Sequence, residues 1–310
     1  IIDIGIGNIF SLKQAVSHVG GIPTVINKPV NWDELDGAAV LKDRTTSGFT
    51  VVHPTSGSGV AATNPNDNEP DMVAWNFRAE PGFFDIVTYT GTGSAHDISH
   101  SLGSEPGMII YKSIDDTREW MVYHRSLGAS QGTILNENYA AFSSSDFGSG
   151  PTSTHFSVGN TAVNNTAGKN YVAYLFADNP SKGIKCDKYT GNSGAQTIDT
   201  GFETGWIMVK NVDSDYRSWL IVDNVRGGGS GNTGKALYAD GSAGESGTNI
   251  DFVSTGFELF DGSSEVNTSS QDYIYIAIAA DPILLGAQAT ASLTADANTS
   301  TNTALSLIHI

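Results

Sequence analysis

Between residues 42 and 280, short apolar segments alternate with polar segments rich in glycine, asparagine, aspartate and serine. No stretch of this region has helical periodicity, so the pattern predicts short antiparallel strands joined by turns. The predicted strands lie near residues 84–89, 95–98, 108–112, 120–124, 156–158 and 171–176, and again near 185–189, 196–198, 206–210, 219–222, 257–260 and 273–278. Strands this short and this frequent are typical of antiparallel β-sandwiches.

The two sets of strands are copies of one unit of about a hundred residues, and the end of a third copy precedes them. A Tyr-Thr-Gly segment at residues 89–91 recurs at 189–191, and an apolar strand that ends in lysine recurs with it. Trp120 recurs as Trp219, and we expect both rings to be core anchors that face the opposite sheet. A repeated unit favours a modular scaffold or binding array over an enzyme, because catalysis normally needs one asymmetric site.

Residues 1–41 follow a different pattern. Apolar strands at 1–4, 23–26 and 38–41 accompany an amphipathic helix at 9–19, which predicts a βαβ arrangement and a parallel sheet. The predicted fold class is therefore mainly β, with tandem antiparallel β-sandwich repeats preceded by a short α/β piece. The predicted divisions are a truncated βαβ fragment at 1–41, the C-terminal remnant of a first β repeat at 42–82, sandwich repeats at 83–181 and 182–281, and a low-complexity tail or linker at 282–310. Long polar loops are expected at 56–71 and 227–247.

Charge, hydrophobicity and cysteine content limit the partners, the location and the covalent links that are expected of the chain. The chain has 33 acidic and 16 basic residues, a formal net charge of -17, so nucleic acid is not an expected partner. No apolar segment approaches the roughly 18 residues of a membrane span, so membrane insertion is not expected. The single cysteine, Cys186, excludes an intrachain disulfide, and we expect it to be a packed core side chain.

Acidic residues occur at matching places in the two repeats, just before the repeated tryptophan. They are Asp115 and Asp116 in the first repeat and Asp213 and Asp215 in the second. Calcium takes carboxylate and carbonyl oxygens from loops, so these four residues are candidate calcium ligands. The alternative, which we prefer, is that they are acidic hairpin tips and that the protein has no cofactor.

The histidines of the first repeat are not expected to form a metal or catalytic site, because the second repeat has other residue types at their positions. His124, for example, matches Asp223. Positions that change in this way are expected to be exposed strand residues. The four histidines are His96, His100, His124 and His155.

Tyr123 and Tyr216 are expected to be exposed aromatic residues near long polar loops. Their rings would stack on sugars while neighbouring asparagine and aspartate side chains bind hydroxyl groups, as in lectin-like sandwiches. These two residues are the candidate ligand-binding residues. Ordinary surface tyrosines would leave the same pattern in the sequence.

The opening segment IIDIGIGNI and the strand DGAAVL at residues 36–41 resemble the N-terminus of the glutamine amidotransferase subunit of imidazole glycerol phosphate synthase. The oxyanion loop of that family does not follow the third strand, and Cys186 lies outside a Gly-x-Cys-x-Gly elbow. The His-x-Glu pair of the family is also missing. No catalytic residue is therefore transferred from this resemblance.

Several motifs recur from residue 45 to residue 281: the Tyr-Thr-Gly start, the lysine and tryptophan strands, Gly-Phe steps at 48–49 and 256–257, and closing strands VAW at 73–75 and VAY at 172–174. In these motifs the region resembles a domain of unknown function from virion structural and tail-fibre-like proteins of marine bacteriophages. The resemblance implies a virion component on the phage tail or particle surface, made in the host cytoplasm. Its expected partners are other virion or tail proteins, host-surface glycan and, in a homotrimer, further copies of itself.

The last segment, LSLIHI at residues 305–310, resembles translated library-adapter sequence. With the change of pattern near residue 41, it indicates a chimeric metagenomic sequence, and a natural fusion is the alternative. The expected function is a non-enzymatic phage structural module, with adhesion to host-surface glycan. The alternative is an enzyme, either a tail-spike-like glycan hydrolase or a truncated, inactive class I glutamine amidotransferase of histidine biosynthesis.

Overall fold

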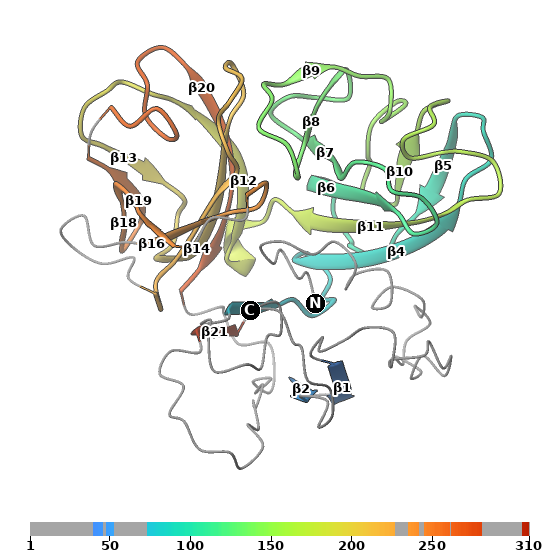
Figure 1. Ribbon diagram of the computed structural model, residues 1–310, viewed down its shortest axis with the longest axis horizontal. Coiled ribbons are helices and arrows are strands. Elements are labelled where there is room, and N and C mark those ends of the chain that lie inside the picture. The colour runs from blue at the N-terminus through green and yellow to red at the C-terminus, as the bar shows by residue number, and fades with distance from the viewer. Residues whose placement is uncertain are drawn as a thin grey trace, which may run out of the picture.

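The computed structural model describes residues 40–45, 48–52, 73–226, 235–241, 245–260, 262–280 and 306–309 (Figure 1). Within these ranges the chain is built of strands, with a short 3-10 helix at Pro180–Lys182 between the two repeats. None of the described segments is an apolar helix long enough to cross a bilayer. Residues 1–39 of the expected βαβ fragment, the expected loop at 56–71 and most of the expected tail lie outside the described residues.

Each repeat is a β-sandwich with one six-stranded sheet and one smaller sheet (Figure 1). In the first repeat the large sheet has the order β4 (Phe84–Thr90), β11 (Asn170–Ala177), β6 (Pro106–Ser113), β7 (Met121–His124), β8 (Gln131–Ile134) and β9 (Phe142–Ser143), and the small sheet pairs β5 (His96–Ser99) with β10 (His155–Val158).

The large sheet of the second repeat has the same order, strand for strand. It consists of β12 (Ile184–Thr190), β20 (Asp272–Ala279), β14 (Thr204–Asn211), β15 (Leu220–Asp223), β16 (Lys235–Tyr238) and β17 (Ser246–Gly247), and its small sheet of β13 (Gln196–Asp199), β19 (Gly256–Leu259) and β18 (Ile250–Val253). All pairings within the two repeats are antiparallel. The predicted tandem β-sandwich is therefore confirmed.

Every strand predicted for the two repeats is present, but five further strands were missed. β8, β9, β16 and β17 are short and carry at most two large apolar residues each, so the hydrophobic pattern does not mark them. β18 (IDFV) is apolar, but only two residues separate it from β19, and the two strands were not distinguished. β16 and β17 lie in the segment 227–247, which the sequence analysis expected to be a loop. They form because the edge of the large sheet supplies hydrogen-bonding partners that a local pattern cannot reveal.

A buried phenylalanine of each small sheet packs against the repeated tyrosine of the large sheet. The ring of Phe156 lies 5.9 Å from Tyr89, and the ring of Phe257 lies 5.9 Å from Tyr189, measured between centroids. Both phenylalanines are completely buried. Each phenylalanine therefore fills space between the two sheets of its sandwich.

The central strands of the large sheets are buried on both faces. In β14, the side chains of Trp206 and Met208 join one apolar core, whereas those of Ile207 and Val209 join another. Successive side chains of a strand point to opposite faces, so one core lies inside the second sandwich and the other lies outside it. The outer core also contains residues of the first repeat, so the two sandwiches share it.

Trp120 and Trp219 are buried, as predicted. The expectation that they face the opposite sheet of their own sandwich is wrong: the ring of Trp120 stacks at 6.4 Å on Tyr174 of its own large sheet, and Trp219 belongs to the core shared with the first repeat. The indole Nε1 of Trp219 donates a hydrogen bond of 2.8 Å to the carbonyl of Ile134 in the first repeat. At this position the large apolar surface of the indole is buried between the repeats, and its N–H still has a hydrogen-bond acceptor.

Matching residues of the two repeats each reach the closing strand of another copy. His124 of the first repeat bonds to the carbonyl of Tyr275 in the second, with 3.1 Å between Nε2 and the oxygen. Asp223 of the second repeat accepts a 3.4 Å hydrogen bond from the indole of Trp75, in β3 (Val73–Asn76) of the partial copy. The ring of Trp75 packs edge-on against Trp206 at 6.1 Å. The three copies therefore surround a common core and do not form a linear array.

The predicted boundary after Leu41 falls inside a strand. β1 (Val40–Thr45) pairs antiparallel with β2 (Gly48–Val52), with Val40 opposite Val52. The two-residue connection to β2 permits only antiparallel pairing between these two strands. The parallel sheet expected of residues 38–41 would involve strands at 1–4 and 23–26, which lie outside the described residues, so it stays a prediction. At the other end of the chain, β21 (Ser306–His309) pairs in parallel with β3.

Candidate functional site

The most faithfully repeated motif has a structural role. The hydroxyls of Tyr89 and Tyr189 each donate a hydrogen bond of 2.7 Å to a backbone carbonyl in the loop before the closing strand. A Cβ atom on Gly91 would lie 2.3 Å from a carbonyl of the same loop, and one on Gly191 would lie 2.2 Å away. The Tyr-Thr-Gly segment is thus required for packing, and the site must be sought elsewhere.

The acidic loop of the first repeat is bound to its own sandwich. A carboxylate oxygen of Asp115 accepts a 2.7 Å hydrogen bond from the backbone N–H of Asn170. Asp116 forms an ion pair of 3.1 Å with Lys169. Both carboxylates therefore have protein partners at the start of β11.

The acidic loop of the second repeat also has protein partners, and one of them belongs to the first repeat. Asp213 accepts a 2.7 Å hydrogen bond from the backbone N–H of Asp272, and Asp215 accepts one of 2.8 Å from Ala140. In the described part of the chain, no three His, Cys, Asp or Glu side chains gather in a way that would hold a metal ion. Calcium binding by Asp115, Asp116, Asp213 and Asp215 stays a prediction.

A buried lysine supplies positive charge inside each acidic loop. The Lys112 ammonium donates to the carbonyls of Asp116 and Arg118, at 3.2 and 2.7 Å, and the Lys210 ammonium donates to the carbonyl of Arg217. Lys210 has no solvent exposure, and this burial lowers its pKa to about 8. The repeated lysine therefore fixes the shape of the loop before the tryptophan strand.

Tyr123 is not exposed, which corrects the sequence analysis. Its side chain is only 4% exposed, and its ring lies 5.5 Å from Phe147. Burial raises its pKa to about 12. The cause is that β7 is buried on both faces, so no residue of this strand faces solvent. A role in ligand binding is therefore not proposed for Tyr123.

Tyr216 is 77% exposed, as predicted, and its backbone has a φ of 62°. A left-handed backbone is uncommon for a bulky residue and persists only where the surroundings impose it. Here the surroundings are the first repeat. The N–H of Arg217 donates a 3.1 Å hydrogen bond to the carbonyl of Asn138, and the carboxylate of Asp215 bonds to Ala140.

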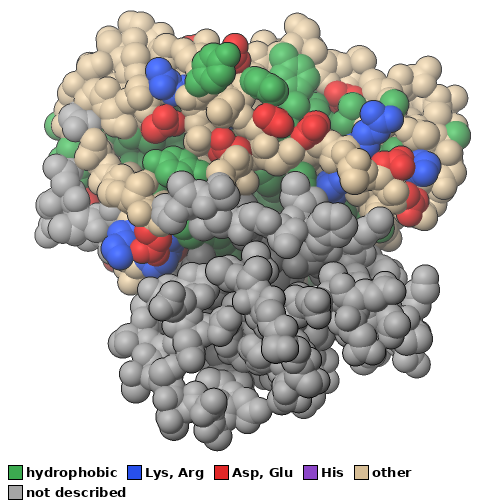
Figure 2. Space-filling view, viewed as in Figure 1, with side chains coloured by type: hydrophobic (Ala, Val, Ile, Leu, Met, Phe, Trp, Pro, Cys, Tyr) green, Lys and Arg blue, Asp and Glu red, His purple; other side chains and the backbone are tan. Residues whose placement is uncertain are grey.

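The same contacts bring the backbone of Tyr139 beside the segment that carries Tyr216. Tyr139 lies between Asn138 and Ala140 and is 48% exposed. Of the three exposed large hydrophobic residues in the described ranges, two are therefore at the junction of the repeats, and the third is Val225. Figure 2 shows hydrophobic side chains gathered, with acidic side chains beside them, along the edge of the molecule above this junction.

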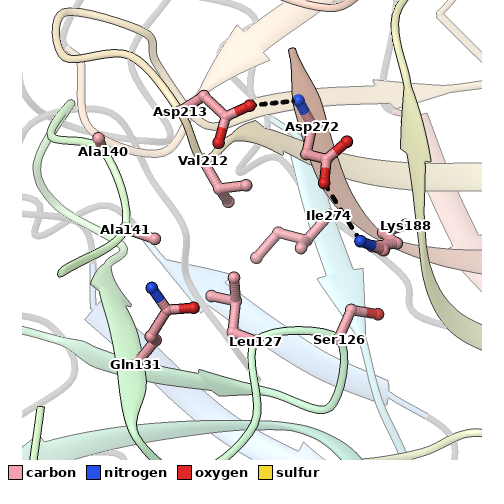
Figure 3. Close-up of a pocket in the computed structure, with 10 residues that line it drawn as sticks. All are labelled: Ser126, Leu127, Gln131, Ala140, Ala141, Lys188, Val212, Asp213, Asp272 and Ile274. Atoms are coloured by element: carbon pink, nitrogen blue, oxygen red, sulfur yellow. Dashed lines mark hydrogen bonds and ion pairs between the residues drawn. The ribbon is translucent and has the colours of Figure 1, made fainter. Parts of the chain in front are cut away.

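A cavity of about 340 Å³ lies next to the segments that carry these two tyrosines, and Ala140, which follows Tyr139, is one of its lining residues (Figure 3). The side chains of Leu127, Val212 and Ile274 point toward its centre. Both repeats line it, with Ser126, Leu127, Gln131, Ala140 and Ala141 from the first and Lys188, Val212, Asp213, Asp272 and Ile274 from the second. We call it the junction cavity.

Charged side chains occupy the wall of the junction cavity that belongs to the second repeat. The Lys188 ammonium pairs with Asp272 at 3.1 Å, and Thr190 donates a 2.6 Å hydrogen bond to the same carboxylate (Figure 3). The bond from Thr190, together with Lys188, lowers the pKa of Asp272. On the opposite wall, the Gln131 amide and the Ser126 hydroxyl make no side-chain hydrogen bond within the described ranges, so they are available to a ligand.

The remaining reactive side chains of the repeats are poor candidates. His124 was expected to be exposed, but it is completely buried because the end of β7 faces the second repeat. Cys186 is also completely buried, and burial raises the pKa of its thiol. His96, His100 and His155 are partly exposed at the small sheet and assemble no metal group in the described part of the chain.

Sequence reasoning found Tyr216 but missed Tyr139 and the junction cavity. One signal was present: neither tyrosine has an aromatic counterpart in the other repeat, where Thr117 and Ala243 lie at or next to the matching places. Both tyrosines lie in exposed loops, so the packing that the repeats share does not account for them; within a strand, a residue that differs between the repeats can still be buried, as His124 is. The pairing of the two loops could not be inferred, because they are more than seventy residues apart in sequence.

The fold and the junction cavity define a tandem β-sandwich protein with a composite cavity to which both repeats contribute. Residues 19–282 match a family described as a domain of unknown function, DUF7483, and the chain belongs to that family. The match begins within the segment expected to be amidotransferase-like. The chain matches no curated protein and no solved structure.

Proposed function

We propose that this chain is a non-enzymatic structural module of a phage particle, of the type found in tail fibres, that adheres to glycan on the host surface. One observation carries the proposal: the two sandwiches share one apolar core, so they form a single body that presents its loops in fixed positions. A spacer or adhesion module needs this property. The resemblance of residues 45–281 to virion proteins of marine bacteriophages supports a place on the particle surface, with other virion or tail proteins as partners.

The charges of the junction cavity favour binding over hydrolysis. Its two carboxylates belong to Asp213 and Asp272. A glycosidase needs one carboxyl that is protonated near neutral pH, and therefore one with a raised pKa. The pKa of Asp272 is lowered instead, and Asp213 is held by a backbone N–H.

The amidotransferase alternative requires a reactive thiolate. Such a cysteine is partly exposed and has a lowered pKa. Cys186 is completely buried with a raised pKa, and its Sγ lies 3.5 Å from the carbonyl of Ala177. Its environment supports a packing role.

Binding and turnover of bacterial surface polysaccharides by the full chain test this proposal. Immobilised lipopolysaccharide and capsular polysaccharide serve as probes in biolayer interferometry, and released reducing ends are measured in parallel. We expect binding without release of reducing ends. Turnover that is lost in Asp272→Asn but kept in Asp115→Asn, its control in the first repeat, would replace the proposal with a glycan hydrolase. Absence of binding to every polysaccharide would contradict adhesion.

A further inference from the structure

We infer that the junction cavity is a binding site for an uncharged sugar, with Tyr139 and Tyr216 as its aromatic rim. This inference rests on the proposed adhesion to glycan and assigns it to one place in the molecule. It uses residues of both repeats, so neither repeat alone contains the site.

The two walls of the site are fixed relative to each other. The backbone N–H of Ala141 donates a 2.9 Å hydrogen bond to the carbonyl of Val212, which also lines the cavity. The bonds of Asp215 to Ala140 and of Arg217 to Asn138 flank this contact. A site that is formed before binding loses little conformational entropy when the ligand arrives, which favours weak ligands such as sugars.

The lining of the cavity suits the two kinds of surface on a sugar ring. Leu127, Val212 and Ile274 supply the apolar part of the lining, which the C–H face of the ring would contact, and polar groups make up the rest (Figure 3). The Gln131 amide donates and accepts, and the carboxylate of Asp272 accepts from hydroxyls in charge-assisted hydrogen bonds. The volume of about 340 Å³ is at the lower end of the range for small-molecule pockets, so we expect one ring inside the cavity.

The charge balance selects against ionic ligands. Two carboxylates, those of Asp213 and Asp272, face the cavity against one ammonium, that of Lys188. An anionic ligand would therefore be repelled, in agreement with the net charge of -17 for the chain. A free cation would have to displace the Lys188 ammonium and the N–H of Asp272, which already occupy these carboxylates.

The rim extends the site beyond the cavity. Tyr139 and Tyr216 carry amphipathic rings that can stack on the next sugar of a chain while their hydroxyls stay in water. Their exposure, at 48% and 77%, leaves both rings accessible. An apolar peptide would not need the polar walls beneath them, so the combination favours an oligosaccharide.

Saturation-transfer NMR on the full chain tests the inference. The probes are D-glucose, D-galactose, D-mannose and N-acetyl-D-glucosamine, with D-glucuronate as the charged comparison. We expect at least one neutral sugar to bind, and Gln131→Ala and Tyr216→Ala each to weaken its binding by about tenfold, the loss of one good contact. Val225→Ala removes the exposed hydrophobic residue outside the junction and should leave binding unchanged. Equal melting temperatures show that the variants are folded.

The outcomes separate this inference from the proposed function. If the chain binds polysaccharide and sugar equally well with and without the substitutions, the junction site is overturned but adhesion stands. If the unsubstituted chain binds no polysaccharide, both fail. Glucuronate that binds as tightly as the neutral sugars would overturn the assignment to an uncharged ligand.

Discussion

At the scale of single residues, a repeat position can keep its role while its chemistry changes. His124 ends β7 and Asp223 ends β15, and both are completely buried. Each bonds to the closing strand of another copy, His124 through its imidazole and Asp223 through its carboxylate, which also pairs with Arg226 at 2.6 Å. The change from histidine to aspartate between the repeats suggested that this position is exposed. Both residues are instead buried, and each makes a hydrogen bond to another copy with a different side chain.

His124 should make the stability of the protein depend on pH. Burial lowers its pKa to about 4; the Tyr275 carbonyl and Asp187 raise it only partly, and Arg125 lowers it further. In the unfolded chain, the imidazole of His124 binds a proton near pH 6.5, whereas in the folded chain it does so only near pH 4. The contribution of neutral His124 to the free energy of unfolding is complete above pH 6.5. It is lost as the pH falls toward 4, and the loss at pH 5 is about 2 kcal/mol.

Urea denaturation at pH 7.5 and pH 5.0 measures this difference. We expect the free energy of unfolding to fall by about 2 kcal/mol more in the unsubstituted chain than in His124→Gln, which cannot titrate. An equal fall in both proteins would show that the folded state tolerates the imidazolium.

At the scale of the elements, burial on both faces explains the unbroken apolar runs of the central strands. Residues of β20 alternate between the two cores, with Tyr273 and Tyr275 in one and Ile274 and Ile276 in the other. A shift of pairing by one residue would exchange the two sets, so each core fixes the register for the other. The large sheet is thus the structural link between the inside of a sandwich and its neighbour.

The Gly-Phe step of the second repeat should tolerate no side chain at its glycine. A Cβ atom on Gly256 would lie 1.9 Å from the carbonyl oxygen of Ile198, so β19 and β13 would have to separate. We expect Gly256→Ala to lower the free energy of unfolding by more than about 2 kcal/mol, as overpacking against backbone does.

Gly247→Ala is the control for this substitution. Gly247 lies in β17, and a Cβ atom there would meet no atom within 4 Å. Its effect on the unfolding free energy should stay within about 0.5 kcal/mol in chemical denaturation. Similar losses in the two variants would refute the backbone clash as the cause.

At the scale of the whole molecule, the shared core brings three copies of one unit together within a single chain. Trp75 of the partial copy contacts Trp206 and Asp223 of the second repeat, and His124 of the first repeat contacts Tyr275 of the second. These contacts bury apolar strand faces that separate chains would otherwise bury against one another.

The homotrimer expected from the sequence can be tested against this arrangement. Because the apolar faces are covered within the chain, we expect light scattering coupled to gel filtration to give the mass of one chain, 32.6 kDa. A mass three times larger would establish the homotrimer. Avidity would then multiply weak binding at three junction cavities.

The sequence by itself determined the repeat, twelve strands of its two full copies and the sandwich class, because strand periodicity and turn residues are local signals. It also determined that Tyr216 is exposed, since the residue lies in a polar loop. Only the tertiary structure decided that Tyr123 is buried, that the segments carrying Tyr139 and Tyr216 lie side by side and that both repeats line a common cavity. These facts depend on which sheet faces pack together, and a strand buried on both faces carries no mark in its own sequence of what covers each face.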